Sequence, residues 1–206
     1  MNKHSGPPEG TGWKPNLSGN SIIWDGSSVV KNYGLRLENY YREQAILKRL
    51  EQLPLPHVLP GSRPGRLKME YIDGIDGQKA IEAGKAGNVL YEMGRFLRQL
   101  HQIDPKSIEG ILPGEGSVVV HGDYAYYNCI MDQKGLKLLA VIDWEVAYLG
   151  DPITDLAWCE WQFRNRFPQH EWAISKLFDG YGSTPDWHLR QEALKKRLDE
   201  LQKNNI

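Results

Sequence analysis

The feature that most constrains this chain is a pair of acidic motifs, each of which follows an apolar run. The motif His-Gly-Asp at 121–123 comes directly after the valines 118–120, and Asn128 follows it after four intervening residues. Asp143 comes directly after a second apolar run, at 138–142. Short apolar runs of this kind are typical of buried strands. The sequence therefore places carboxylates at the ends of buried strands, where a charged group needs a functional reason.

Asp123, Asn128 and Asp143 carry the oxygen atoms that phosphoryl transfer requires. The transferred group is strongly anionic, so the protein mainly holds Mg²⁺ and orients the attacking hydroxyl. Mg²⁺ prefers hard oxygen ligands in octahedral geometry and takes only one or two of them from protein. The spacing H-x-D-x-x-x-x-N, followed by a metal-binding aspartate, is also that of protein kinases. The pattern predicts a magnesium site rather than solvated surface carboxylates.

Three ordered blocks resemble the aminoglycoside phosphotransferase and choline kinase family of small-molecule kinases. They read H-G-D-x-x-x-x-N at 121–128, I-D-W-E at 142–145 and G-D-P-x-x-D-L-A at 150–157. Three blocks in the family's order are a far more specific signal than a single His-Gly-Asp. Glu145 stands where many kinases have glycine, and its role stays open between a metal-proximal and a more distant position.

The resemblance implies a role for each of the polar residues in these blocks. Asp123 accepts or orients the proton of the substrate hydroxyl, while Asn128 and Asp143 bind Mg²⁺. The remaining polar residues of the blocks are expected to be architectural, capping a helix or anchoring the catalytic loop by hydrogen bonds. These architectural residues are His121, Asp151 and Asp155.

Upstream, the sequence predicts a small β-rich region that binds nucleotide. Asp25-Gly26 lies between two strand-like runs and predicts a type I′ hairpin. Lys31 ends the second strand, and Glu43 lies in a helix predicted over 37–53. In kinases, a strand lysine contacts the nucleotide phosphates and pairs with a helix glutamate. Lys31 and Glu43 are therefore predicted to serve nucleotide binding.

The strand predicted over 66–72 corresponds by resemblance to the hinge between two lobes. In that family, backbone groups of the hinge bond to the adenine edge, which implies the carbonyl of Glu70 and the amide of Ile72. A glycine-rich G-x-G-x-x-G loop is lacking near the first hairpin, and residues 17–20 are the weak candidate for covering the phosphates.

Length and charge set the remaining expectations. A chain of 206 residues suits one or two small domains, and a net charge of −1 implies no basic face for nucleic acid or anionic membrane. No apolar run is long enough to span a membrane, and the opening residues lack the apolar core of a signal peptide. Cys129 and Cys159 are expected to be buried free thiols, which suits a cytoplasmic protein. Residues 1–12 are predicted to be disordered.

Apolar residues at helical spacing predict four helices in the second half of the chain. Their expected ranges are 86–102, 152–166, 168–178 and 186–203. Together with the strands, they predict an α+β, bilobal, protein-kinase-like fold. Its small β-rich, nucleotide-binding N-lobe covers residues 1–72, and its mainly helical C-lobe, with the catalytic loop, metal site and acceptor side, covers 73–206.

These observations predict a phosphotransferase that uses ATP or GTP with Mg²⁺ and moves the γ-phosphate to an alcohol. The acceptor would be a small molecule such as a sugar, amino sugar, aminocyclitol or amino alcohol. Two alternatives stay open. A small atypical protein kinase shares His-Gly-Asp but usually lacks G-D-P-x-x-D-L-A, and a regulatory pseudokinase would explain the missing glycine-rich loop.

Overall fold

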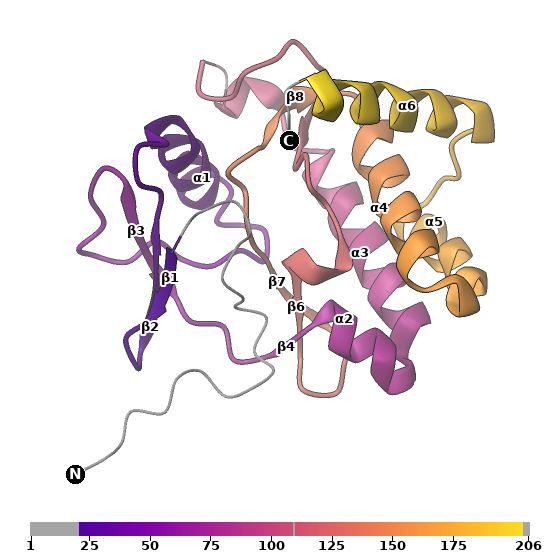
Figure 1. Ribbon diagram of the computed structural model, residues 1–206, viewed down its shortest axis with the longest axis horizontal. Coiled ribbons are helices and arrows are strands. Elements are labelled where there is room, and N and C mark those ends of the chain that lie inside the picture. Colours follow the sequence, from indigo (N-terminus) through magenta and orange to yellow (C-terminus); the bar gives the residue numbers. More distant parts are fainter. Residues whose placement is uncertain (1–20, 109, 204–206) are drawn as a thin grey trace.

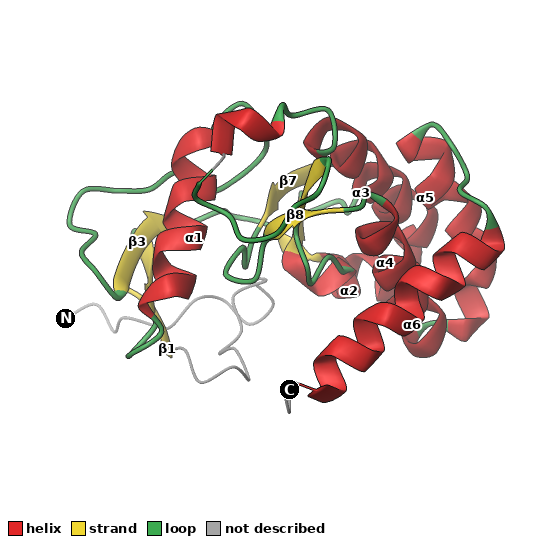
Figure 2. Ribbon diagram, turned by 90° about the horizontal axis from the view of Figure 1, so that it is seen from above, coloured by secondary structure: helices red, strands yellow, loops and turns green. Residues whose placement is uncertain are grey.

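The structure, a computed structural model, describes residues 21–108 and 110–203. It begins with an antiparallel sheet in the order β1-β2-β3, formed by Ser21–Trp24, Ser28–Asn32 and Arg66–Glu70. The helix α1, Leu37–Arg49, lies beside this sheet in both ribbon views (Figures 1 and 2). We call β1–β3 and α1 the N-terminal part. The predicted disorder at 1–12 and the candidate phosphate loop at 17–20 lie outside the described residues.

The hairpin between β1 and β2 forms, but its turn is not the predicted type I′. Trp24 pairs with Val29, so four residues, 25–28, lie between the last paired residues of the hairpin. A type I′ turn needs a positive φ at both central residues, whereas at this turn only Gly26 has one, with φ of 94°. Asp25 instead accepts hydrogen bonds from the backbone amides of Ser27 and Ser28 at 3.1 and 2.8 Å. This side-chain turn replaces the expected backbone turn.

The helix predicted over 37–53 ends four residues early, at Arg49. Prolines at 54 and 56 disfavour helical backbone in the residues that precede them. Leu53 is nevertheless buried, and the carbonyl of Pro54 accepts a hydrogen bond from the amide of Val141 at 3.0 Å. The apolar pattern thus continues past the helix because this loop packs against the rest of the molecule.

The C-terminal part, from residue 75 onward, contains two small antiparallel sheets and most of the helices. One sheet has the order β4-β6-β7, formed by Ile75–Asp76, Cys129–Met131 and Leu138–Val141. The other pairs β5, Val118–Val120, with β8, Tyr148–Gly150. Both apolar runs that precede the acidic motifs therefore form strands, as the sequence predicts. The predicted division at residue 72 falls between β3 and β4 and stays a prediction.

The helices of the C-terminal part gather on one side of these sheets (Figure 1). They are α2, Gly77–Ala80; α3, Ala86–Leu100; α4, Ile153–Arg166; α5, Ile174–Tyr181; and α6, Trp187–Lys203. Short 3-10 or π turns occupy Ile81–Lys85, Pro105–Ile108, Tyr126–Asn128 and Pro168–Ala173. The helix predicted over 168–178 is thus a 3-10 turn followed by α5.

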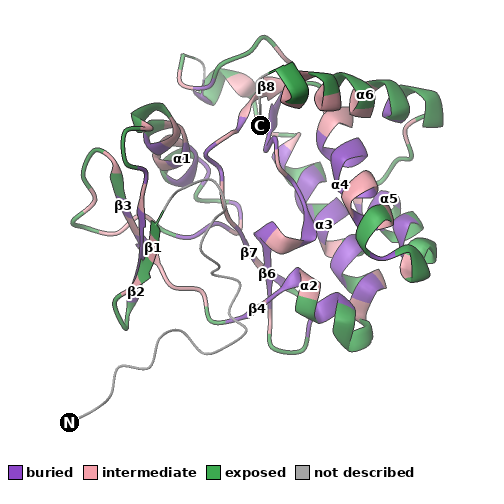
Figure 3. Cartoon of the chain, viewed as in Figure 1, coloured by how far each residue is buried: buried purple, intermediate pink, exposed green. Residues whose placement is uncertain are grey.

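The helices α3 and α5 pack closely because each presents a glycine to the other. A Cβ atom at Gly94 would collide with the carbonyl of Leu177, and one at Gly180 would collide with the carbonyl of Tyr91. The inward face of α3 is apolar and fully buried, as the predicted stripe required. Figure 3 shows buried residues concentrated along α3, α4 and the strands beside them. This core supports the loops that follow β5 and β7.

No helix within the described ranges combines the length and apolar character needed to cross a membrane.

Candidate active site

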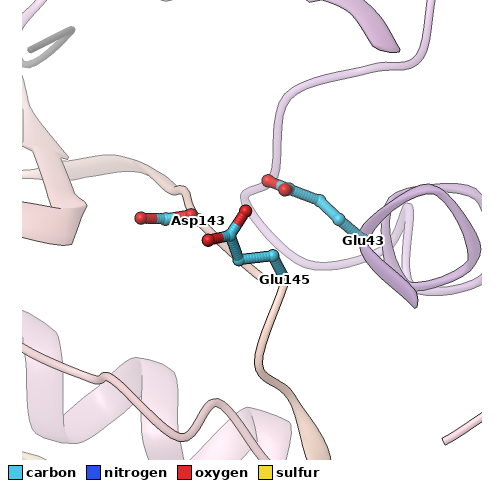
Figure 4. Close-up of side chains that lie close together, drawn as sticks. All are labelled: Glu43, Asp143 and Glu145. Carbon is cyan, nitrogen blue, oxygen red and sulfur yellow. The ribbon is translucent and has the colours of Figure 1, made fainter. Parts of the chain in front are cut away.

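Three carboxylates converge on one buried ammonium group between the N-terminal and C-terminal parts. The Nζ atom of Lys31, on β2, lies 2.7 Å from Glu43 Oε2, 2.5 Å from Asp143 Oδ1 and 3.1 Å from Glu145 Oε2. Figure 4 shows the carboxylates, with Glu43 on α1 and the other two on the segment after β7. The structure thus brings Lys31 and Glu43 together, while their contact with nucleotide stays a prediction. We call these four residues the Lys31 cluster.

The Lys31 cluster contains more acidic than basic groups. Burial alone would lower the pKa of Lys31, but the charges of Glu43, Asp143 and Glu145 outweigh it and raise that pKa above its ordinary value. Lys31 therefore stays protonated, and one positive charge faces three carboxyl groups. One oxygen from each of the three lies within 4.8 Å of the others. Hard oxygen donors with excess negative charge suit Mg²⁺, so the residues fit the predicted cofactor.

Glu43 is held by groups from both sides of the cluster. The hydroxyl of Tyr33 donates to Glu43 Oε2 at 2.5 Å, and the amide of Trp144 donates to Oε1 at 3.3 Å. Trp144 lies between Asp143 and Glu145 in the chain, so this bond ties α1 to the segment that carries the other two carboxylates. Sequence reasoning did not find Tyr33 or the place of Glu145. The glutamate in I-D-W-E was the only signal for the latter.

Asp143 and Asn128 are brought together by the pairing of β6 with β7. Cys129 pairs with Val141, and the amide of Ile142 donates to the carbonyl of Asn128 at 2.9 Å. Asp143 then turns into a left-handed conformation, with φ of 71°, and among the described residues other than glycine only Asp143 has a positive φ. Such conformations are uncommon outside glycine and cluster at functional sites. The backbone thus directs Asp143 toward Lys31 instead of continuing the strand.

Asp123 lies on the loop after β5, half-buried, with hydrogen bonds to both of its carboxylate oxygens. Tyr127 Oη donates to Oδ1 at 2.8 Å, and Trp158 Nε1 donates to the same oxygen at 3.0 Å. Asn128 Nδ2 lies 2.8 Å from the carbonyl of Asp123 and 3.3 Å from its Oδ2. Burial raises the pKa of Asp123, and the Tyr127 bond opposes that rise. The nitrogen of Asn128 is engaged by Asp123, so its amide oxygen is the atom suited to a cation.

Asp155 holds the loop that follows β5 in place from the first turn of α4. Its two carboxylate oxygens accept hydrogen bonds from the backbone amides of His121 and Gly122, at 2.8 and 3.1 Å. His121 is fully buried, and its Nε2 lies 3.0 Å from the carbonyl of Ile142. Gly122 has φ of 83°, which favours glycine. The expected anchoring roles of His121 and Asp155 are confirmed, and Asp151, which is exposed, caps the start of α4 as expected by accepting a hydrogen bond from the amide of Ile153.

The helix α6 also reaches the loop that follows β5. Arg197, on α6, donates from Nη2 to the carbonyl of Gly122 at 2.7 Å, and its guanidinium lies 5.9 Å from the ring centre of Trp158. A groove of about 680 Å³ runs between β8 and α6, and Arg197 lies on its wall. No local sequence pattern predicts these contacts, because 75 residues separate Arg197 from Gly122.

The predicted hinge residues lie away from the Lys31 cluster. Glu70 ends β3 and its amide donates to the carbonyl of His57 at 2.9 Å, while Ile72 lies in the connection to β4. Lys31 pairs with Leu67, three residues before Glu70, which corresponds to about 10 Å along a strand. Contact of Glu70 or Ile72 with a nucleotide base stays a prediction.

Comparison with known proteins identifies the family of this chain. The family model described as the phosphotransferase enzyme family matches residues 21–116 and 107–193. The chain belongs to the phosphotransferase enzyme family. The predicted membership of a phosphotransferase family is therefore confirmed, while the activity of this chain stays a prediction. Among curated proteins, mouse acyl-CoA dehydrogenase family member 10 is 43% identical over 42 residues, which is 20% of this chain and 4% of the relative. Mouse member 11 is 44% identical over 39 residues, or 19% of this chain and 5% of the relative.

Solved structures of phosphotransferases share the fold. Aminoglycoside phosphotransferase APH(3'')-Id from Streptomyces rimosus, in complex with ADP and streptomycin, has a TM-score of 0.69 and 21% identity, and 94% of each chain is covered. A choline/ethanolamine kinase family protein from Mesorhizobium loti has a TM-score of 0.60 and 16% identity, with 98% of this chain and 81% of that one covered. The predicted α+β, kinase-like fold and the resemblance to this family are thus confirmed.

The anchoring role of Asp155 predicts a large loss of stability when it is truncated. We expect Asp155→Ala to lower the free energy of unfolding by about 3 kcal/mol, because two buried amides lose their acceptor. The matched control is Asp151→Ala, which removes an exposed carboxylate at the same helix start and should cost about 1 kcal/mol or less. Urea denaturation followed by circular dichroism would measure both. Equal losses in the two variants would contradict the role of Asp155.

Proposed function

We propose that this phosphotransferase moves the γ-phosphate of ATP or GTP to an alcohol group of a small molecule. The observation that carries the proposal is the meeting of Asp123, Asn128 and Asp143 beside the buried ion pair of Lys31 with Glu43. Phosphoryl transfer needs a positioned hydroxyl, oxygen ligands for a metal and a cation for the phosphates, and these residues offer all three.

In this proposal, each residue has one task. Asp123 accepts a hydrogen bond from the acceptor hydroxyl and takes its proton as the new oxygen–phosphorus bond forms, while the bond from the γ-phosphorus to the β,γ-bridging oxygen breaks and the nucleoside diphosphate leaves. Asn128 and Asp143 hold Mg²⁺, which supplies charge neutralisation to the phosphates when bound. When nucleotide binds, the Lys31 ammonium exchanges its contact with Asp143 for one with the phosphates, and it keeps its ion pair with Glu43. Glu70 and Ile72 offer their backbone to the nucleotide base.

The acceptor is proposed to be a sugar, amino sugar, aminocyclitol or amino alcohol in the cytoplasm. The names of the structural neighbours, an aminoglycoside phosphotransferase bound to streptomycin and a choline/ethanolamine kinase family protein, support this chemical class. At such low identity they support the class only, since one fold hosts many substrates. The curated relatives match over too small a share of their length to bear on the acceptor.

The test is a nucleotide-consumption screen of the purified chain with Mg·ATP and Mg·GTP. The acceptor panel contains sugars, aminoglycosides, aminocyclitols, choline-like amines and a set of serine and threonine peptides. We expect turnover that requires both Mg²⁺ and one class of small alcohol, with the phosphorylated product seen by mass spectrometry. Turnover on peptides alone would favour the protein kinase alternative. Tight nucleotide binding without transfer to any member would favour the pseudokinase alternative and overturn the proposal.

A further inference from the structure

One oxygen of the Asp123 carboxylate accepts hydrogen bonds from two side chains that approach from different elements. Tyr127, in the loop itself, donates to Oδ1 at 2.8 Å, and Trp158, on α4, donates to it at 3.0 Å. Gln162, one turn further along α4, donates from Nε2 to the hydroxyl oxygen of Tyr127 at 3.1 Å. Since a phenol has one proton to give, this contact leaves the Tyr127 proton directed at Asp123.

Both donors keep their protons under ordinary conditions. An indole N–H is a donor only and cannot accept a proton at neutral pH. The Tyr127 hydroxyl donates its single proton to Oδ1 and accepts a hydrogen bond from Gln162 Nε2, so both of its roles are already taken. Tyr127 and Trp158 therefore remain donors to Oδ1 and are unsuited to take the proton of an acceptor hydroxyl themselves.

The other oxygen of Asp123 is held much less tightly. The contact of Oδ2 with Asn128 Nδ2 is 3.3 Å long, while that same nitrogen has a shorter bond, of 2.8 Å, to the Asp123 carbonyl. Two strong donors on one oxygen fix the plane of a carboxylate and leave the lone pairs of its partner oxygen for a further donor. Oδ2 is thus the oxygen that an incoming hydroxyl can reach.

We propose that Tyr127 and Trp158 are positioning residues that fix the Asp123 carboxylate so that Oδ2 meets the acceptor hydroxyl. This inference rests on the proposed function, because it assigns a task to Asp123 in phosphoryl transfer. Two side chains pack against the Trp158 ring: the guanidinium of Arg197 lies over it, and the indole of Trp161 lies with its ring centre 5.1 Å away. The placement of Asp123 therefore depends on α4 and α6 as well as on its own loop.

Kinetics of matched variants tests this role. Trp158→Phe and Tyr127→Phe each remove one donor and keep a ring, so we expect kcat to fall about tenfold to a hundredfold while KM for Mg·ATP stays within about threefold. The controls are Trp172→Phe, whose ring is 60% exposed, and Tyr126→Phe, whose ring packs against Phe167. Both controls should keep kcat within about twofold. A wild-type kcat in Trp158→Phe and Tyr127→Phe would overturn the proposal.

A spectroscopic measurement tests the contact itself without any turnover. The chain has seven tryptophans, so a ¹H–¹⁵N correlation spectrum contains at most seven indole signals. The signal lost in Trp158→Phe assigns Trp158, and the one lost in Trp161→Phe assigns Trp161. We expect Asp123→Ala to move the Trp158 signal upfield, because its carboxylate partner is gone, and to leave that of Trp161 nearly unchanged. A Trp158 signal that stays in place would overturn the proposal.

The two measurements separate this inference from the proposed function. If the wild type transfers phosphate and the Phe variants are fully active, the positioning role alone is wrong. If the wild type transfers phosphate to no acceptor, the proposed function falls, and the positioning role falls with it even where the indole signal shows the contact. Where Asp123→Ala fails to fold, Tyr127→Phe replaces it in the spectrum, because losing one of two donors strengthens the other and should move the Trp158 signal downfield.

Discussion

Asp143→Ala is expected to abolish magnesium-dependent nucleotide binding and phosphoryl transfer. Asp143 lies two residues beyond the end of β7. Its carboxylate lies 2.5 Å from Lys31 Nζ in a cluster of three acids and one base. Removing a charged metal ligand should weaken Mg·ATP binding at least about 10²-fold, since even outer-shell changes cost 10- to 100-fold in metal affinity. Turnover should fall below detection. Calorimetry with Mg·ATP, and with ATP in the presence of EDTA, would measure the loss.

The same substitution should leave the fold intact. Lys31 keeps Glu43 at 2.7 Å and Glu145 at 3.1 Å, so no buried ammonium is left without a carboxylate. Asp151→Ala serves as the control, because that carboxylate is exposed and bonds only to the start of α4. We expect normal thermal unfolding in Asp143→Ala, a shift of at most a few degrees in Asp151→Ala, and normal Mg·ATP affinity in the control. Unchanged affinity and turnover in Asp143→Ala would exclude Asp143 as a metal ligand.

Much of this site follows from local sequence because its residues sit at the ends of short strands. The runs that precede His121 and Asp143 are apolar enough to form β5 and β7. A carboxylate that follows such a strand closely must lie at the end of the sheet where the strand ends. The interval from Asp123 to Asn128 spans a single loop, so their closeness is a local property. The spacing of Lys31 and Glu43 gained meaning only through the family resemblance.

The contacts that the sequence did not predict join residues far apart in the chain. Trp158 lies 35 residues beyond Asp123, and Arg197 lies 75 residues beyond Gly122. Their meeting depends on how α4 and α6 pack, and no local pattern encodes that packing. The place of Glu145 depends on the left-handed backbone of Asp143, which a periodicity argument cannot foresee. The early end of α1 has a local cause in the prolines at 54 and 56, which outweighed the helical spacing of the leucines.

Asp123→Asn is expected to separate chemistry from nucleotide binding. The amide oxygen can still accept the bonds from Tyr127 and Trp158 at the Oδ1 position, so the loop should keep its structure. The amide nitrogen then takes the place of Oδ2 and cannot take a proton from the acceptor. We expect kcat to fall by about 10² or more, since base and positioning effects contribute about 10² to 10⁴. Mg·ATP affinity should stay within about threefold of the wild type, because Asp123 is not proposed to bind metal.

The control for this variant is Asp132→Asn, the same exchange at the turn between β6 and β7. Asp132 accepts hydrogen bonds from the backbone amides of Leu136 and Lys137. An asparagine oxygen can accept the same bonds, so activity and stability should be unchanged. Initial rates with the acceptor found by the screen, together with Mg·ATP calorimetry, would test both variants. A near-normal kcat in Asp123→Asn would remove Asp123 from the chemical step. Lost Mg·ATP binding with an intact fold would instead place Asp123 at the metal site, either as a ligand or through its contact with Asn128 Nδ2, because groups that orient a metal ligand also change metal affinity.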